Sequence, residues 1–257
     1  MNRHHARQLR VFAFLIALFG VLTFVAYAAF PTPQLPPTAQ TPASAPHLSL
    51  PMFALAAAVV ALGYGLFGLA GYWFAGRLGL PSIYREQGTW REWLAWPAGL
   101  GAAVGLLLII GDRLFGAAGQ TLILPHPAFP FSVIASAAAA IGEEILFRSF
   151  VLGLWAFLLA AVLRRWNRTA AALWAGVLIA ALAFSAAHLP AAMVLFGVTT
   201  PGDLPPLLLA EFMVLNTLLG VAAGERYLRD GLVAAIGLHF WADIVWHVVG
   251  PLLLHPG

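Results

Sequence analysis

The chain has 257 residues, of which 61% are hydrophobic and only 9% are charged. With a mean hydropathy of +0.88, this composition excludes a soluble globular protein and indicates an integral membrane protein. The chain has no cysteine, which excludes disulfides, thiolate metal ligands and a thiol nucleophile.

Seven apolar segments recur along the chain, each at least as long as the roughly 20 residues that a helix needs to cross a bilayer. Strands of a membrane barrel would be about 10 residues long with strict alternation. The sequence therefore predicts an all-α fold, a polytopic transmembrane helical bundle of about seven spans. The segments are 11–30, 52–75, 94–115, 131–163, 170–189, 204–223 and 231–254.

All 13 basic residues are arginines, and eleven of them fall on one side of this predicted topology. Cytoplasmic loops hold an excess of Lys and Arg, so we expect a cytoplasmic N-terminus and an exterior C-terminus. The same distribution accounts for the pI of about 9.8 without nucleic acid as a partner. The eleven are Arg3, Arg7, Arg10, Arg77, Arg85, Arg91, Arg164, Arg165, Arg168, Arg226 and Arg229.

The N-terminal part of the chain is predicted to carry three spans and little chemistry. The first apolar segment ends in "VAYAAF" and could be a signal peptide, but its length favours a retained helix. The uncharged, proline-rich residues 31–47 predict an extended or disordered exterior linker. After the second span, Trp90, Trp93 and Trp96 recur at helical spacing, which predicts an interfacial helix at the cytoplasmic surface.

The fourth segment is too long for one simple crossing, so we expect it to tilt, to bend near Gly142, or to begin outside the hydrocarbon. This segment opens the second half of the chain. We divide the chain into an N-terminal membrane region, residues 1–130 with three spans, and a core, residues 131–257 with four spans that carry the candidate site.

Ionisable side chains inside a span are costly, and they usually face the bundle interior or a water-filled cavity. The fourth segment contains "EEILFR", in which Glu144 and Arg148 are four residues apart and can pair on one helix face. Glu143 lies about 100° around the helix from Glu144, which leaves it free for another role.

Two further spans carry polar side chains that could meet Glu143. The fifth segment ends in "FSAAH" with His188, and the seventh places His239, Asp243 and His247 along one helical stripe. Any one of these residues could simply stabilise helix packing. Their combination on separate helices favours a single functional site built from Glu143, His188, His239 and Asp243.

Three other polar residues are left open. Glu211 and Asn216 in the sixth segment are ambiguous, and His247 is expected to be a wall residue or to lie nearer the exterior interface.

The stretches "EEILFR", "FSAAH" and "HFWAD" resemble, in the same order, the EExxxR, FxxxH and HxxxN/D motifs of the CPBP family. This family joins type II CAAX prenyl endopeptidases to bacterial Abi proteins. The resemblance covers roughly residues 131–246. It implies an intramembrane protease of a bacterial inner membrane, a hydrolase acting on a peptide or membrane-protein substrate without a cofactor.

The resemblance also implies roles for the site residues. Glu143 would be the general base that activates water, with His188 helping to hold that water, and His239 and residue 243 would stabilise the oxyanion. Glu144 and Arg148 would brace the first motif as a structural ion pair. Asp243 stands where the prenyl endopeptidases usually carry Asn, and an ionised Asp cannot donate a hydrogen bond. We therefore expect Asp243 to orient His239.

The residues alone leave two alternative functions open. Glu143, Glu144, His188 and His239 could instead bind zinc in a metal-dependent membrane protease, although the HExxH spacing is absent. From a different class, the same groups could serve a proton-coupled carrier or a non-catalytic membrane scaffold.

Overall fold

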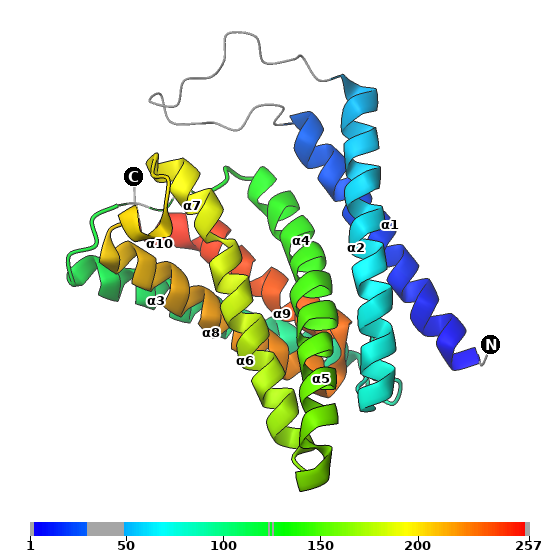
Figure 1. Cartoon of the computed structure of the whole chain (residues 1–257). Helices are drawn as coiled ribbons and strands as arrows, with labels where there is room; N and C mark the ends of the chain where they lie inside the picture. Colours follow the sequence, from blue (N-terminus) through cyan, green and yellow to red (C-terminus); the bar gives the residue numbers. More distant parts are fainter. Residues whose placement is uncertain (1–2, 30–48, 123, 125, 255–257) are drawn as a thin grey trace.

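The computed structural model describes residues 3–29, 49–122, 124 and 126–254. All regular secondary structure in this part of the chain is helical (Figure 1). The proline-rich stretch, for which an extended linker is predicted, lies outside the described residues. Seven helical segments are long and apolar enough to cross a membrane, so the predicted polytopic helical bundle is confirmed. They are Arg3–Ala29, Leu50–Leu78, Arg91–Ala117, Phe131–Trp166, Thr169–Phe196, Pro206–Asp230 and Leu232–Leu252.

The first three spans contain α1 (Arg3–Ala29), α2 (Leu50–Leu78) and α3 (Trp96–Ala117). The tryptophan-rich segment does not form a separate interfacial helix. A π-helical turn, η1 (Arg91–Ala95), leads directly into α3, so this segment is the beginning of the third span. Its Trp90 and Trp96 are exposed on the outside of the bundle.

The fourth span is one continuous helical run with a change of geometry in its middle. It consists of α4 (Phe131–Glu143), the π-helical η2 (Glu144–Leu152), α5 (Gly153–Leu163) and a final 3₁₀ turn, η3 (Arg164–Trp166). The irregularity follows Gly142, where a bend is predicted from the sequence. π-Helical turns inside α-helices often mark functional sites, and this one begins between the two glutamates.

The last three spans complete the bundle. They are built from α6 (Thr169–Ala187) with α7 (Leu189–Phe196), then α8 (Pro206–Asp230), and finally α9 (Leu232–Ile244) with the π-helical η5 (Val245–Val249) and α10 (Gly250–Leu254). A short 3₁₀ turn, η4 (Pro201–Asp203), precedes α8. In Figure 1, α3, α8 and α9 cross obliquely behind the steeper α4, α5 and α6.

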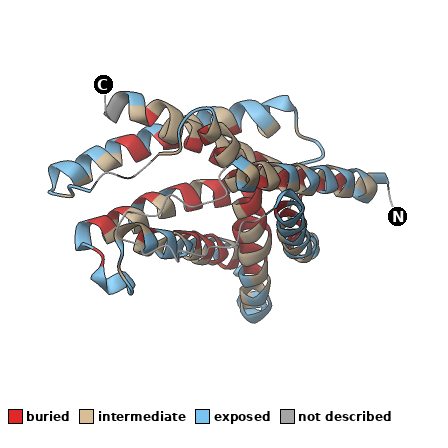
Figure 2. Cartoon of the chain, turned by 90° about the horizontal axis from the view of Figure 1, so that it is seen from above, coloured by how far each residue is buried: buried red, intermediate tan, exposed pale blue. Residues whose placement is uncertain are grey.

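The outward faces of the helices are apolar. Leu62 and Leu66 of α2, Leu107 of α3 and Leu182 of α6 are all exposed. Figure 2 shows the buried residues on the sides of the helices that face one another and the exposed ones on the outside. An apolar surface of this extent requires a lipid environment, so the chain is an integral membrane protein.

The N-terminal region packs directly on the core. Phe12 and Phe19 of α1 share one hydrophobic cluster with Ile141 of α4 and Ile145 of η2. At the N-terminal end of α1, the buried Gln8 accepts hydrogen bonds from the backbone N–H groups of Ile83 and Tyr84 and donates one to the Tyr84 carbonyl, at 2.9–3.2 Å. The division at residue 130 remains a prediction.

Glycines bring α3 and α9 into close backbone contact. A Cβ atom at Gly101 would collide with the carbonyl oxygen of Leu238, and one at Gly105 would lie 2.6 Å from that of Ala242. Side chains at either position would push the helices apart. Leu238 and Ala242 each precede a candidate site residue, so this contact helps to position His239 and Asp243.

Candidate active site

The two adjacent glutamates of the fourth span reach the same imidazole. Glu144 Oε1 accepts a hydrogen bond from His239 Nδ1 at 2.8 Å, and Glu143 Oε2 lies 3.7 Å from His239 Nε2. The Glu144 side chain is fully buried, whereas that of Glu143 is 30% exposed. Glu144 is therefore enclosed by protein, and Glu143 is the carboxylate that a water molecule can reach.

Glu144 also makes the predicted ion pair. Its Oε2 lies 3.1 Å from Nε of Arg148, and both side chains are completely buried. A carboxylate oxygen accepts hydrogen bonds, so Nδ1 of His239 is the donor in its contact with Glu144. The hydrogen bond that fixes the ring of His239 is thus made by Glu144, whereas Asp243 was expected to provide it.

Asp243 lies on the other side of the ring. Its Oδ1 is 3.6 Å from Nε2 of His239, one helical turn along α9. Nε2 therefore faces Glu143 and Asp243 together, while Nδ1 faces Glu144. Three carboxyl groups therefore surround one imidazole.

His188 is held by the backbone of its own helix. Its Nδ1 lies 2.8 Å from the carbonyl oxygen of Phe184. A carbonyl only accepts hydrogen bonds, so Nδ1 is the protonated nitrogen and Nε2 keeps its lone pair in the neutral ring. His188 can therefore accept a hydrogen bond through Nε2.

The ring of Phe184 connects all three motifs. The Arg148 guanidinium stacks over it at 4.6 Å, and the rings of His188 and His239 contact it at centroid distances of 4.7 and 5.6 Å. Phe184 is fully buried. A cation over an aromatic face is stabilised by the ring quadrupole, which partly compensates Arg148 for the loss of water.

The four predicted catalytic residues line one cavity of about 390 Å³, here called the central cavity. This volume is typical of sites that bind small ligands or a few residues of a peptide. Glu211, Asn216 and His247, which the sequence left open, lie in the same wall. The polar residues of the lining are Glu143, His188, Glu211, Asn216, His239, Asp243 and His247.

Residues 125–245 match the family described as type II CAAX prenyl endopeptidase Rce1-like. The match contains all three motifs and every predicted catalytic residue. Across this region, just under half of the chain, the sequence is similar to the Rce1-like family. The resemblance expected from the motifs is thereby confirmed, and it supports a CAAX-protease-like membrane endopeptidase in general. A search of curated proteins found no match, and neither did a search of solved structures.

The zinc alternative requires several ligands around one point. Within the described ranges, no three His, Asp or Glu side chains are grouped so that they could hold a metal ion. Glu144, one of the four candidate ligands, is already occupied by Arg148 and by His239.

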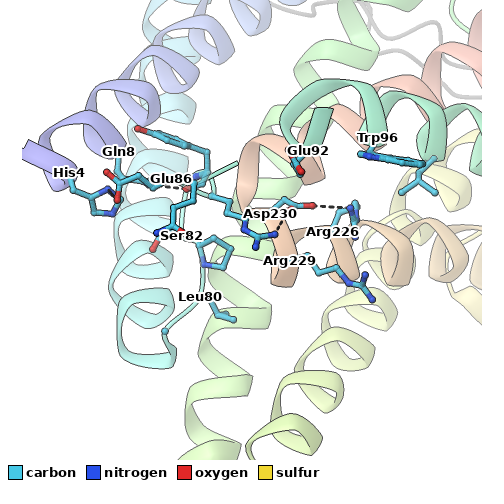
Figure 3. A pocket seen from close by; sticks show the side chains of 16 residues that line it. His4, Gln8, Leu80, Ser82, Glu86, Glu92, Trp96, Arg226, Arg229 and Asp230 are labelled. Atoms are coloured by element: carbon cyan, nitrogen blue, oxygen red, sulfur yellow. Dashed lines mark hydrogen bonds and ion pairs between the residues drawn. The ribbon is translucent and has the colours of Figure 1, made fainter. Parts of the chain in front are cut away.

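A second hollow, of about 850 Å³, lies at the opposite end of α8, here called the arginine-rich end. Figure 3 shows it between the start of α1, the connection after α2 and the last turn of α8. Its charges are paired: Arg226 contacts Asp230 at 2.8 Å, Arg85 approaches Asp230 at 3.6 Å, and His4 contacts Glu86 at 2.8 Å. The hollow contains none of the predicted catalytic residues, and its paired charges explain how this end of the bundle is held together.

The sequence alone missed three contributors to the site. The contact between Glu144 and His239 joins residues 95 positions apart. The ring of Phe184 was quoted only as part of a motif, although it contacts Arg148 and both histidines. The tight contact of Gly101 with α9 has only a weak sequence signal, since small residues are common throughout membrane helices.

Proposed function

We propose that this protein is an intramembrane endopeptidase that hydrolyses peptide bonds with a water molecule activated by Glu143. The observation that carries the proposal is the environment of His239. One ring nitrogen is fixed by the buried Glu144, and the other faces the accessible Glu143 and Asp243 within the central cavity.

Water activation is assigned to Glu143 and His188. Glu143 is the exposed member of the glutamate pair, so it is the carboxylate placed to accept a proton from a water molecule in the cavity. A water molecule beside Glu143 would donate one proton to this carboxylate. The lone pair of His188 Nε2, left free by the contact of Nδ1 with Phe184, would accept its other hydrogen.

Oxyanion stabilisation is assigned to His239. With Nδ1 held by Glu144, the protonated ring presents Nε2–H to the cavity, where it would donate to the carbonyl oxygen of the scissile bond. Asp243, close to the same nitrogen, stabilises the positive ring. Fixed donors of this kind act most strongly where water is sparse.

The reaction balances with these groups alone. The water oxygen attacks the carbonyl carbon while Glu143 takes its proton, and the carbonyl oxygen becomes the oxyanion held by His239. Glu143 then returns the proton to the leaving nitrogen as the C–N bond breaks. The products are a carboxylic acid and an amine, and Glu143 is regenerated.

We further place the protein in a bacterial inner membrane with a cytoplasmic N-terminus. The basis for this orientation is the excess of arginine at one end of the bundle. The lining of the central cavity includes Leu124 before α4 and Leu195 of α7, which lie toward the other end. On this orientation the cavity opens toward the exterior face.

The test uses purified full-length wild type and Glu143→Gln in detergent, each mixed with a library of quenched fluorescent peptides, with and without a chelator. We expect cleavage by the wild type that the chelator leaves unchanged, and a loss of about 10²- to 10⁴-fold in Glu143→Gln. Glu86→Gln, at an exposed carboxylate of the arginine-rich end, is the matched control and should cleave normally.

Other results would redirect the assignment. Cleavage abolished by the chelator and restored by zinc would favour the metal-dependent protease. No cleavage by the folded wild type would favour a carrier or scaffold. Solute or proton movement across sealed vesicles would separate these two.

A further inference from the structure

Glu211 is a buried acid that the proposed reaction does not use. It lies on α8 in the wall of the central cavity, and its side chain is inaccessible to solvent. Gln120 Nε2 donates a hydrogen bond to Glu211 Oε2 at 2.6 Å, while Oε1 has no hydrogen-bond partner in the described part of the chain. A buried polar atom without a partner is rare and calls for a ligand or a function.

The orientation of Gln120 is fixed by the backbone. Its Oε1 accepts a hydrogen bond from the N–H of Leu122, and its Nε2 also donates to the Leu122 carbonyl. The amide nitrogen, and not the amide oxygen, therefore faces Glu211. Gln120 supplies a neutral donor only, so it leaves the charge of Glu211 uncompensated.

The surroundings of Glu211 add a second acid and no cation. Asp112, near the end of α3, lies within side-chain hydrogen-bonding reach of the same carboxyl group, so the two acids can share a proton until a cation replaces it. Among the described residues, no Arg or His lies within ion-pair distance of Glu211. A buried negative charge without a counter-ion costs several kcal/mol, and two neighbouring acids increase the cost.

The other polar groups of the wall do not supply the missing charge. Asn216 donates its side-chain N–H to the carbonyl oxygen of Phe212 on its own helix. His247 contacts His126, with their Nδ1 atoms 3.1 Å apart, so one ring must present a lone pair to the other. In the described part of the chain, neither of these two side chains is hydrogen-bonded to Glu211.

Glu211 and the candidate catalytic group belong to one enclosed space. Glu211, Leu215 and Leu219 line the cavity from α8 at successive helical turns, and Glu143 and His239 line it from α4 and α9. A peptide held with its scissile bond at Glu143 would extend along the same walls. A cationic group on that peptide would find Glu211 as an acidic partner in the described wall, besides the catalytic carboxylates.

We propose that Glu211 is a specificity-determining residue, which binds a protonated amine or guanidinium of the peptide substrate. The cation is either the side chain of a Lys or Arg near the scissile bond or the terminal ammonium of a short peptide. This inference rests on the proposed function, because it names the substrate that the same cavity would select.

The test compares three matched peptides on the wild type. The first is N-acetylated and carries one Lys, the second is N-acetylated with neutral norleucine in its place, and the third carries norleucine with a free N-terminal amine. Further versions of the first peptide carry the Lys at successive positions along the sequence. We expect one cationic peptide to exceed the neutral one by about 10-fold or more in kcat/KM, the strength of one charge-assisted hydrogen bond. The first and third peptides distinguish the two sources of the cation.

A binding measurement keeps the inference separate from catalysis. Glu143→Gln is used to measure the affinity of labelled Lys and norleucine peptides by fluorescence anisotropy. Glu211→Gln in the same background should lose the preference for the cationic peptide, and Glu86→Gln should keep it. Preferential binding of the cation without any cleavage by the wild type would support this inference and overturn the proposed function.

The inference fails if the wild type cleaves, or Glu143→Gln binds, cationic and neutral peptides equally. It also fails if Glu211→Gln retains the full preference. Because the wild-type comparison changes only the peptide, it remains decisive even if Glu211→Gln does not fold.

Discussion

Glu144 holds the ring of His239 by a 2.8 Å hydrogen bond and faces Arg148 through its other oxygen. One fully buried carboxylate therefore connects the fourth span to the last one. Its neighbour Glu143 has no such partner and is partly exposed to the cavity. Adjacent residues of the same type thus stand in opposite environments, which predicts that they respond differently to substitution.

We expect Glu144→Gln to destabilise the protein and Glu143→Gln to leave its stability unchanged. Removing one member of a buried ion pair leaves the other charge uncompensated, at a cost of about 3–5 kcal/mol. Thermal unfolding of both variants in the same detergent measures the difference. Both should lose peptide cleavage, but only Glu144→Gln should unfold early. Equal melting temperatures would contradict the bracing role of Glu144.

Asp243→Asn should retain substantial activity. Glu144 already fixes the ring at Nδ1, so the ring keeps its orientation without the Asp243 charge. The amide of Asn could also donate to an oxyanion, as an ionised Asp cannot. Comparing kcat/KM of this variant with that of the wild type tests the role. Complete loss of cleavage in a folded Asp243→Asn protein would show that the charge itself is required.

Gly101→Ala should weaken both the fold and the site. The added methyl group would meet the carbonyl oxygen of Leu238, next to His239, and overpacking of this kind costs about 1–3 kcal/mol. Gly99 on the same helix offers a matched control, because a Cβ atom there meets nothing within 4 Å. We expect a lower melting temperature and slower cleavage for Gly101→Ala only. Identical behaviour of the two variants would exclude the close contact of α3 with α9.

The orientation of the protein can be tested by labelling, because the chain contains no cysteine. Thr199→Cys, after α7, and Gln87→Cys, between α2 and α3, both lie at exposed positions near opposite ends of the bundle. In intact cells, a membrane-impermeant maleimide should label Thr199→Cys and not Gln87→Cys. Lysed cells should show labelling of both. The reverse pattern would place the opening of the cavity on the cytoplasmic side.

The spans and motifs could be predicted from the sequence because they depend on local information. A run of about 20 apolar residues identifies a span wherever it packs, and a polar side chain within it points to the interior. The boundary between η1 and α3 could not be predicted in this way. Trp and Arg at helical spacing are compatible both with an interfacial helix and with the first turns of a span.

The contacts between motifs depend on packing, which the sequence does not encode locally. On a regular helix Glu143 and Glu144 point about 100° apart, which suggested that they serve different partners. An imidazole has nitrogens on opposite edges, so one ring can face both carboxylates at once. The environment of Glu211 was equally hidden, since its partner Gln120 lies 91 positions earlier in the chain.

Phe184 has a consequence for how this site tolerates change. Its ring touches Arg148, His188 and His239, so it acts as a spacer whose thickness sets the separation of three helices. A smaller apolar residue at position 184 would leave a gap between the helices. Arg148, His188 and His239 would then no longer be held at fixed distances from one another. The motifs are therefore not interchangeable modules, and transplanting the glutamates and histidines into another bundle would require the aromatic ring to be moved with them.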